Sequence, residues 1–201
     1  QLADELHVAA PAFKIGDNFL IAVNGVIVPR PRIDKGLGLR LIFLANVVVN
    51  LINNYFDVMV KEIIAQGGYI DKFIGDAILA VFRGNYHLDR AIDSCLAVKA
   101  QIEKLPTLAG NSFKPDVSIG INSGEMISGN IGSATLRRLD YTVIGDIVNT
   151  AQRLQAAASP GQIIINETSY KKVKESFHCK AAGEIKLKNK ANAVVIYEVT
   201  D

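Results

Sequence analysis

Two charged residues that could act on a phosphorylated ligand lie in the stretch GGYIDKFIGDAILAVF, residues 67–82. Alternating side chains predict a hairpin whose turn is at Gly75 and Asp76. A carboxylate at a turn is exposed enough to bind a hard divalent cation, and the amine of Lys72 lies close enough along the strand to contact a bound nucleotide. An ordinary hairpin turn with a solvated lysine has the same residues. This stretch alone therefore leaves a functional and a purely structural interpretation open.

A second group of polar residues leads into a predicted helix. Asn149 and Arg153 are four residues apart, so they lie on one face of that helix. An amide and a guanidinium on one face suit the steering of a sugar and the stabilisation of a phosphoryl transition state. A polar face on a surface helix is the alternative explanation. The remaining members of the group are Arg137, Arg138 and Thr142.

The basic stretch KLKNK, residues 186–190, is the third candidate. Its lysines, Lys188 among them, form a local positive charge that could contact a polyphosphate. A solvated turn between two strands would explain the same composition. The stretch is therefore a candidate only in combination with the other two groups.

The elements that must position these residues mix helices and strands. Apolar residues recur at every fourth position from about 44 to 66, which predicts a helix with a broad buried face. Within strand 69–74, strict alternation places Lys72 on one face and Asp71 on the other. The further expected helices are 88–105, 146–158 and 167–174, and the further expected strands are 77–82, 117–122, 125–132, 139–145, 162–166, 183–188 and 193–199.

Helices do not follow every predicted strand, as they would in a parallel doubly wound sheet. The pattern therefore predicts an α+β domain, with an antiparallel-rich sheet and helices packed on one side of it. Ser123 and Gly124 are expected to join two of the strands. Residues 1–40 are assigned to an N-terminal extension and first-strand region without clear elements, and residues 41–201 to the main domain.

Bulk composition restricts the class of protein. The 201 residues, 49% of them apolar, suit one principal domain with a sizeable core. A net charge of +2 spread along the chain argues against a nucleic-acid surface. The longest apolar run, 39–52, includes Arg40 and is shorter than the ~20 residues of a membrane span, so no span is expected. Cys95 and Cys179 lack metal-ligand spacing and favour free thiols in a reducing compartment, with the cytoplasm as the expected location.

Three motifs in order resemble the class III adenylyl/guanylyl cyclase catalytic domain: GGYIDKFIGDAILAVF, VSIGINSGEMISGNIGS and RRLDYTVIGDIVNTAQRLQAAASPGQIIINETSY. The resemblance runs from about residue 44 to residue 199. It implies a ferredoxin-like α+β architecture and the conversion of ATP to 3′,5′-cyclic AMP and pyrophosphate. In that reaction the ribose 3′-oxygen attacks the α-phosphorus with the help of two Mg²⁺ or Mn²⁺ ions.

The resemblance also implies partners. Cyclase chains pair head to tail, with nucleotide sites at the interface, so the expected partner is a second copy of this chain or a homologous cyclase chain. One half of the pair supplies the metal-binding aspartates, and the other half contacts the base, the ribose and the reacting phosphorus. An upstream regulatory domain is expected as a further partner.

Residue roles follow from the same resemblance at the matching positions. Asp76 resembles the second of the two metal-binding aspartates. Lys72 resembles the lysine that recognises the adenine ring, and Thr142 resembles its partner in the bacterial variant of the motif. Asn149 resembles the asparagine that orients the ribose, and Arg153 resembles the arginine that stabilises the pentavalent phosphorus.

Two further residues resemble phosphate contacts of this family. Lys188 resembles the triphosphate-binding lysine, since LKNK stands where the family often has VKGK. Arg137 resembles a second phosphate contact. Because metal and base residues belong to opposite halves of the pair, the hairpin at 67–82 would serve two different sites.

The chain departs from the family in residues 20–45. The family begins with a strand ending in a motif like F-x-D-I-x-G-F-T, whose aspartate is the first metal ligand. Asp34, in PRIDKGLG, lies at about the right distance from the second aspartate but lacks the apolar strand before it and the Phe-Thr after it. Two interpretations remain, an active adenylate cyclase and a catalytically silent module that binds nucleotide and dimerises. A diguanylate cyclase is disfavoured because no GGDEF-like signature is present.

Overall fold

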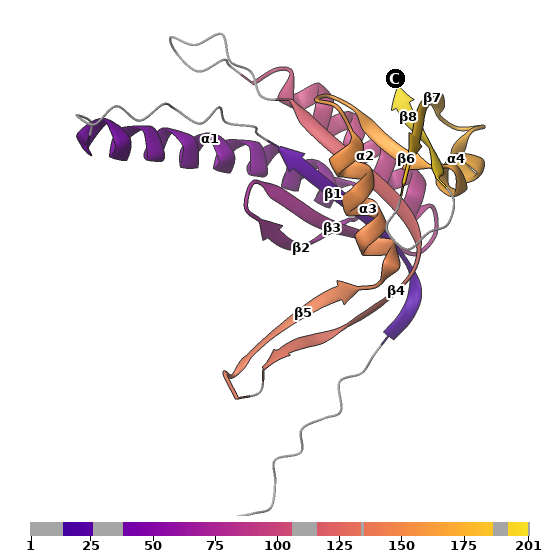
Figure 1. Ribbon diagram of the computed structural model, residues 1–201, viewed down its shortest axis with the longest axis horizontal. Coiled ribbons are helices and arrows are strands. Elements are labelled where there is room, and N and C mark those ends of the chain that lie inside the picture. Colours follow the sequence, from indigo (N-terminus) through magenta and orange to yellow (C-terminus); the bar gives the residue numbers. More distant parts are fainter. Residues whose placement is uncertain (1–13, 26–37, 106–115, 134, 187–192, 201) are drawn as a thin grey trace, which may run out of the picture.

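The computed structural model describes residues 14–25, 38–105, 116–133, 135–186 and 193–200 (Figure 1). Its helices and strands succeed one another irregularly along the chain, as the sequence predicts. In order they are β1 (Lys14–Gly25), α1 (Gly38–Ala65), β2 (Tyr69–Ile74), β3 (Ala77–Arg83), α2 (His87–Ile102), β4 (Val117–Ser133), β5 (Arg138–Ile144), α3 (Asp146–Ala157), β6 (Ile163–Asn166), α4 (Glu167–Val173), β7 (His178–Ile185) and β8 (Val194–Thr200).

The strands form one eight-stranded sheet in the described part of the chain. Its order is β2-β3-β1-β4-β6-β8-β7, and β5 pairs with β4 outside this path. Neighbouring strands are antiparallel except for β4 and β6, which are parallel. The predicted α+β fold with an antiparallel-rich sheet is therefore confirmed.

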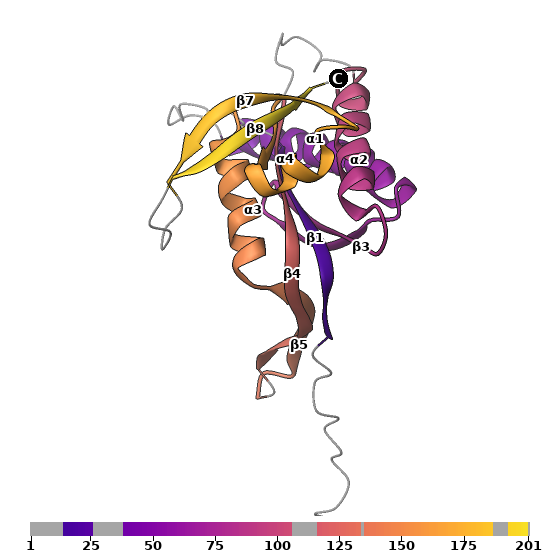
Figure 2. The same cartoon turned by 90° about the vertical axis from the view of Figure 1, so that its right-hand side faces the viewer.

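Helices cover both faces of the sheet, so the prediction that they pack on one side was wrong (Figure 2). On one face α1, α2 and α4 bury a large core that includes Met59 and Phe82. On the other face α3 contributes Ala151 to a cluster with Leu79 and Val81. The reason lies in β3, whose apolar run shows no alternation, a pattern typical of a strand buried on both faces.

β4 is one continuous strand, where the sequence predicted two strands joined at Ser123 and Gly124. β1 pairs with it from Val117 to Ser128, straight through the expected joint, and this pairing keeps the backbone extended there. The far part of β4 pairs with β5 instead. These two strand segments, 127–133 and 138–144, form an arm that projects from the body of the molecule (Figure 1).

β1 lies in the region that the sequence left without clear elements. It runs antiparallel to both β3 and β4 and so occupies the middle of the sheet. Asn24 pairs with Ala77, which places the end of β1 beside the turn between β2 and β3. The strand thus reaches the same edge as the predicted metal-binding aspartate.

Two other expectations concern cysteines and membrane spans. Cys95 and Cys179 are both free, as predicted, and burial raises the pKa of the Cys95 thiol. Within the described ranges, the helices are too short or too polar to cross a bilayer.

Candidate active site

The hairpin of β2 and β3 holds Asp76 in a two-residue turn. Ile74 pairs with Ala77, so Gly75 and Asp76 form the turn itself. Gly75 has a φ of 63°, which glycine adopts at little cost. A Cβ at Gly75 would meet no atom of the described residues within 4 Å, so they leave the space beside the turn open. Asp76 is partly exposed there, in keeping with its predicted place at the rim of the hairpin.

A β-bulge in β2 changes the orientation of the lysine predicted to contact a base. The register with β3 shifts between Ile70 and Lys72, which leaves Asp71 as the extra residue. The Lys72 Nζ lies 3.5 Å from the Asp71 Oδ2. The prediction that these two side chains point to opposite faces was therefore wrong, because a bulge interrupts the alternation of a strand. Bulges are common beside active sites, where they redirect a side chain.

Thr142 approaches the same carboxylate from β5. Its Oγ1 donates a hydrogen bond of 2.7 Å to the Asp71 Oδ2. The structure thus brings Lys72 and Thr142, which are far apart in the sequence, to one oxygen atom. Asp71 has no role predicted from the sequence, although a carboxylate next to a candidate lysine was a usable signal.

Two neighbours complete this side of the sheet. Tyr69 accepts a hydrogen bond of 2.6 Å from the Arg83 Nη2, and the Arg83 guanidinium lies 4.8 Å from the centre of the Tyr69 ring. Burial raises the pKa of Tyr69, and the positive charge of Arg83 opposes that rise. Tyr69 therefore stays a neutral phenol beside Asp71.

α3 carries Asn149 and Arg153 on the other side of the sheet from α1 and α2. Asn149 is exposed and Arg153 is partly buried. Asn122, buried in β4, holds the first turn of the helix in place, since its Nδ2 donates to the Ile147 carbonyl at 3.1 Å. Asn166 supports Asn122 in turn, because its Nδ2 donates to the Asn122 Oδ1 at 2.8 Å.

Gly120 allows α3 to pack directly on β4. A Cβ at this position would collide with the backbone nitrogen of Gln155 and would lie 2.5 Å from the Ala151 carbonyl oxygen. We expect Gly120→Ala to lower the free energy of unfolding by about 3 kcal/mol or more, because backbone atoms cannot move aside as a flexible side chain can. Urea unfolding followed by circular dichroism measures this. Glu125→Ala, at an exposed position of the same strand, is the control and should change stability by less than about 0.5 kcal/mol.

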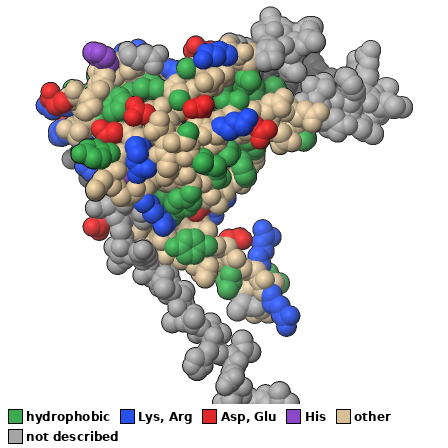
Figure 3. Space-filling view, turned by 180° about the vertical axis from the view of Figure 1, so that it is seen from behind, with side chains coloured by type: hydrophobic (Ala, Val, Ile, Leu, Met, Phe, Trp, Pro, Cys, Tyr) green, Lys and Arg blue, Asp and Glu red, His purple; other side chains and the backbone are tan. Residues whose placement is uncertain are grey.

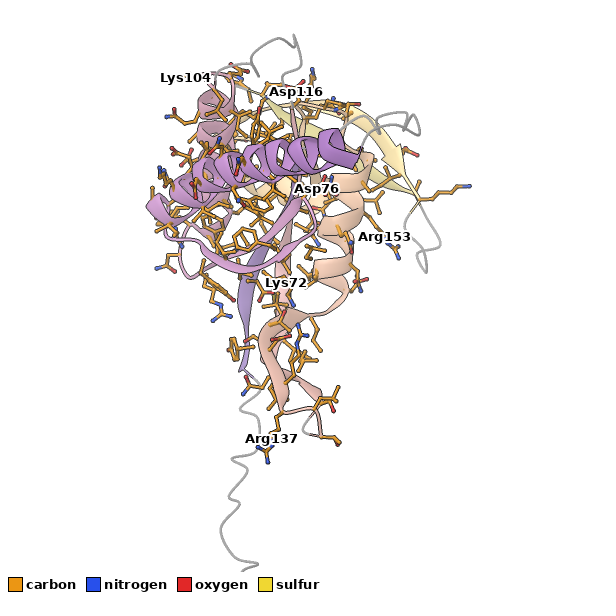
Figure 4. All side chains as sticks on the ribbon, turned by 90° about the vertical axis from the view of Figure 1, so that its left-hand side faces the viewer. Lys72, Asp76, Lys104, Asp116, Arg137 and Arg153 are labelled. Carbon is orange, nitrogen blue, oxygen red and sulfur yellow. The ribbon has the colours of Figure 1, made fainter. Side chains whose placement is uncertain are left out.

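Not all predicted site residues lie together within one chain. Arg137 is exposed at the end of the arm with a φ of 49°, and Figure 4 shows it far from the hairpin that carries Lys72 and Asp76. Figure 4 also shows Arg153 on α3, a different element from the hairpin. Lys188 and Asp34 lie outside the described residues.

Asp76 is the candidate ligand for a divalent ion. The described residues contain no group of three or more His, Cys, Asp or Glu side chains that could hold a metal by themselves. The strand end beside Asp76 carries Asn24 and Gly25 rather than a carboxylate. The hard oxygen donor and the open turn fit Mg²⁺ or Mn²⁺ at Asp76, with further ligands supplied from elsewhere.

Comparison with known proteins identifies the family. Residues 41–200 match the model of the adenylate and guanylate cyclase catalytic domain. The chain belongs to this family. The cyclase domain is 34% identical over 169 residues to "Adenylate cyclase, terminal-differentiation specific" of Dictyostelium discoideum. That alignment covers 79% of this chain but only 8% of the relative, so the chain spans a small part of that protein's length.

Solved structures of cyclases share the fold of this domain. The adenylyl cyclase CyaB from P. aeruginosa superposes with a TM-score of 0.79 and 28% identity, covering 94% of this chain and 96% of that chain. The guanylyl cyclase Cya2 is also 28% identical, with a TM-score of 0.70 and coverage of 92% of each chain. Since an adenylyl and a guanylyl cyclase are equally similar in sequence, overall identity does not decide which base the cyclase domain prefers.

Proposed function

We propose that the cyclase domain converts ATP to 3′,5′-cyclic AMP and pyrophosphate. The observation that supports adenine over guanine is the meeting of Lys72 and Thr142 at the Asp71 Oδ2. An ammonium and a hydroxyl held side by side form one small polar surface for the edge of a base. Lys72 donates to a ring nitrogen of adenine, and Thr142 accepts from its exocyclic amino group.

The helix α3 supplies the groups for the sugar and the reacting phosphorus. The Asn149 amide orients the ribose so that its 3′-oxygen faces the α-phosphorus. The Arg153 guanidinium stabilises the negative charge that develops at the pentavalent phosphorus. Lys188 and Arg137 contact the triphosphate.

Asp76 would hold a divalent ion, Mg²⁺ or Mn²⁺, at the open turn of the hairpin. When bound, two such ions per site would lower the pKa of the ribose 3′-hydroxyl and neutralise the triphosphate. The protein contributes the carboxylate of Asp76, which it presents on a short turn between two paired strands. A glycine at position 75 keeps that turn accessible to a nucleotide.

The partner is a second copy of the chain, paired head to tail so that each site takes Asp76 from one copy and α3 from the other. Support comes from apolar side chains that the single chain leaves exposed. On β2, Phe73 is 53% and Ile74 is 51% exposed. On the arm, Leu139 and Tyr141 are also more than half exposed, and Figure 3 shows hydrophobic side chains at and along the arm. Apolar surface gathered in this way is typical of a protein interface.

Nucleotide preference tests the proposed function. We expect kcat/KM for ATP to exceed that for GTP by about tenfold or more, because guanine reverses the donor and acceptor pattern and leaves Lys72 and Thr142 mispaired at about 1–3 kcal/mol each. Cyclic AMP and cyclic GMP formation with Mn²⁺ are measured side by side. Equal turnover of ATP and GTP would contradict the assignment of these two residues.

A further inference from the structure

Asp71 is a buried carboxylate for which the proposed reaction has no direct use. Its side chain is 1% exposed. The Oδ2 takes the hydrogen bond of Thr142 at 2.7 Å and faces the Lys72 ammonium at 3.5 Å. The Oδ1 is buried and has no hydrogen-bond partner among the described residues. A half-satisfied buried carboxylate lowers stability, so packing alone does not explain its presence.

The hydrogen bond from Thr142 determines what that hydroxyl can offer a ligand. An ionised carboxylate has acceptors only, so the single hydroxyl hydrogen of Thr142 must point to Asp71. Only the lone pairs of the Thr142 Oγ1 then remain, and the group can accept but cannot donate. Lys72 is restricted in the opposite sense, since its ammonium, whose Nζ lies 3.5 Å from the Asp71 Oδ2, has donors only.

We propose that Asp71 is the positioning residue that makes the site specific for a 6-amino purine, by forcing Thr142 to accept while Lys72 donates. This inference rests on the proposed function, because it concerns the base of the same nucleotide. Adenine presents a ring-nitrogen acceptor beside an amino donor, which matches the pair. Guanine presents a ring N–H donor beside a carbonyl acceptor. Its donor would then face the donor Lys72, and its acceptor would face the acceptor Thr142.

The bulge in β2 makes this arrangement possible. Strict alternation would turn Asp71 away from Lys72, whereas the extra residue brings the two side chains to the same side. β5, which carries Thr142, belongs to the strand pair that forms the arm. Asp71 therefore links the two strands that carry Lys72 and Thr142, and its own side chain is only 1% exposed.

The test is Asp71→Asn in the full chain, with kcat/KM measured for ATP and for GTP in the presence of Mn²⁺. The amide can donate to the Thr142 Oγ1, which frees the hydroxyl hydrogen for the guanine carbonyl. We expect the ATP-to-GTP ratio to fall by about tenfold, which corresponds to about 1.4 kcal/mol of lost discrimination. In a Thr142→Val background the same substitution should change the ratio no further, since the hydroxyl that it acts on is gone.

Glu198 offers a matched control. Its side chain is 11% exposed, and its Oε2 also takes a hydrogen bond, from Gln162 at 2.9 Å, and an ion pair, with Lys180 at 3.0 Å. Glu198→Gln should leave the ATP-to-GTP ratio unchanged, because β8 lies away from the base-contacting pair. Thr142→Ser keeps the hydroxyl and should keep the wild-type ratio, whereas Thr142→Val should lose it even if Asp71→Asn does not fold.

The outcomes separate this inference from the proposed function. A wild-type chain that makes neither cyclic nucleotide contradicts the proposed function. In that case the ratio of the calorimetric affinities for ATP and GTP with Mn²⁺ replaces the ratio of kcat/KM, and the wild type and the variants are compared by it. A wild-type preference for ATP that survives in a folded Asp71→Asn variant overturns the role of Asp71, and one that survives Thr142→Val overturns the role of the hydroxyl on which Asp71 acts. A wild-type chain with equal affinity for the two nucleotides overturns both roles.

Discussion

Asp76→Ala and Arg153→Ala are each expected to lower cyclic AMP formation by about 100- to 1,000-fold, because one removes the proposed metal ligand and the other the charge proposed to stabilise the transition state. Mixing the two variants should restore about a quarter of the wild-type activity, since random exchange makes half of the dimers mixed and one of the two sites in each mixed dimer is intact. Cyclic AMP formation with Mn²⁺, followed after co-refolding or prolonged mixing, measures the recovery.

A second mixture is the control for this prediction. Asn149 and Arg153 both lie on α3 and so would serve the same site in the proposed arrangement. When Asn149→Ala is mixed with Arg153→Ala, every site of the mixed dimer lacks one of the two groups, and no activity should return. Recovery in this mixture, or none in the first, would contradict sites shared between two copies in the proposed arrangement.

The sequence predicted the hairpin and the helix α3 well, because both depend on local signals. Gly75 marks a turn between two short strands, and the turn is where it was expected. The helix that carries Asn149 and Arg153 begins at Asp146, as the sequence predicted. Local propensity and side-chain spacing were sufficient for these elements.

The errors arise where tertiary pairing overrides a local signal. Ser123 and Gly124 look like a joint between strands, yet pairing with β1 keeps them extended. The bulge that brings Asp71 to Lys72 depends on the register with β3, which no local pattern shows. The contact between Asp71 and Lys72 was therefore not predictable, for the same reason that the orientation of Lys72 was predicted incorrectly.

The proposed metal site depends on the same kind of non-local pairing. The register of β1 with β3 places Asn24 opposite Ala77, beside Asp76. The chain then continues through residues 26–37, in which Asp34 is the one carboxylate in the sequence. From the sequence, Asp34 is therefore the candidate in this segment for a second carboxylate.

We therefore expect Asp34→Ala to lower cyclic AMP formation with Mn²⁺ by about 100-fold or more, because a single carboxylate would face two divalent ions and the 3′-hydroxyl would stay poorly activated. ATP affinity, measured by calorimetry, should change little, since Lys72, Thr142 and Lys188 still contact the nucleotide. Asp17→Asn is the matched control. Asp17 pairs with Glu125 at the opposite end of β1, so this substitution should leave turnover unchanged.

A wild-type chain that binds ATP but barely cyclises it would instead support the nucleotide-binding module. Full turnover in Asp34→Ala would mean that the second ligand comes from another residue or from the partner.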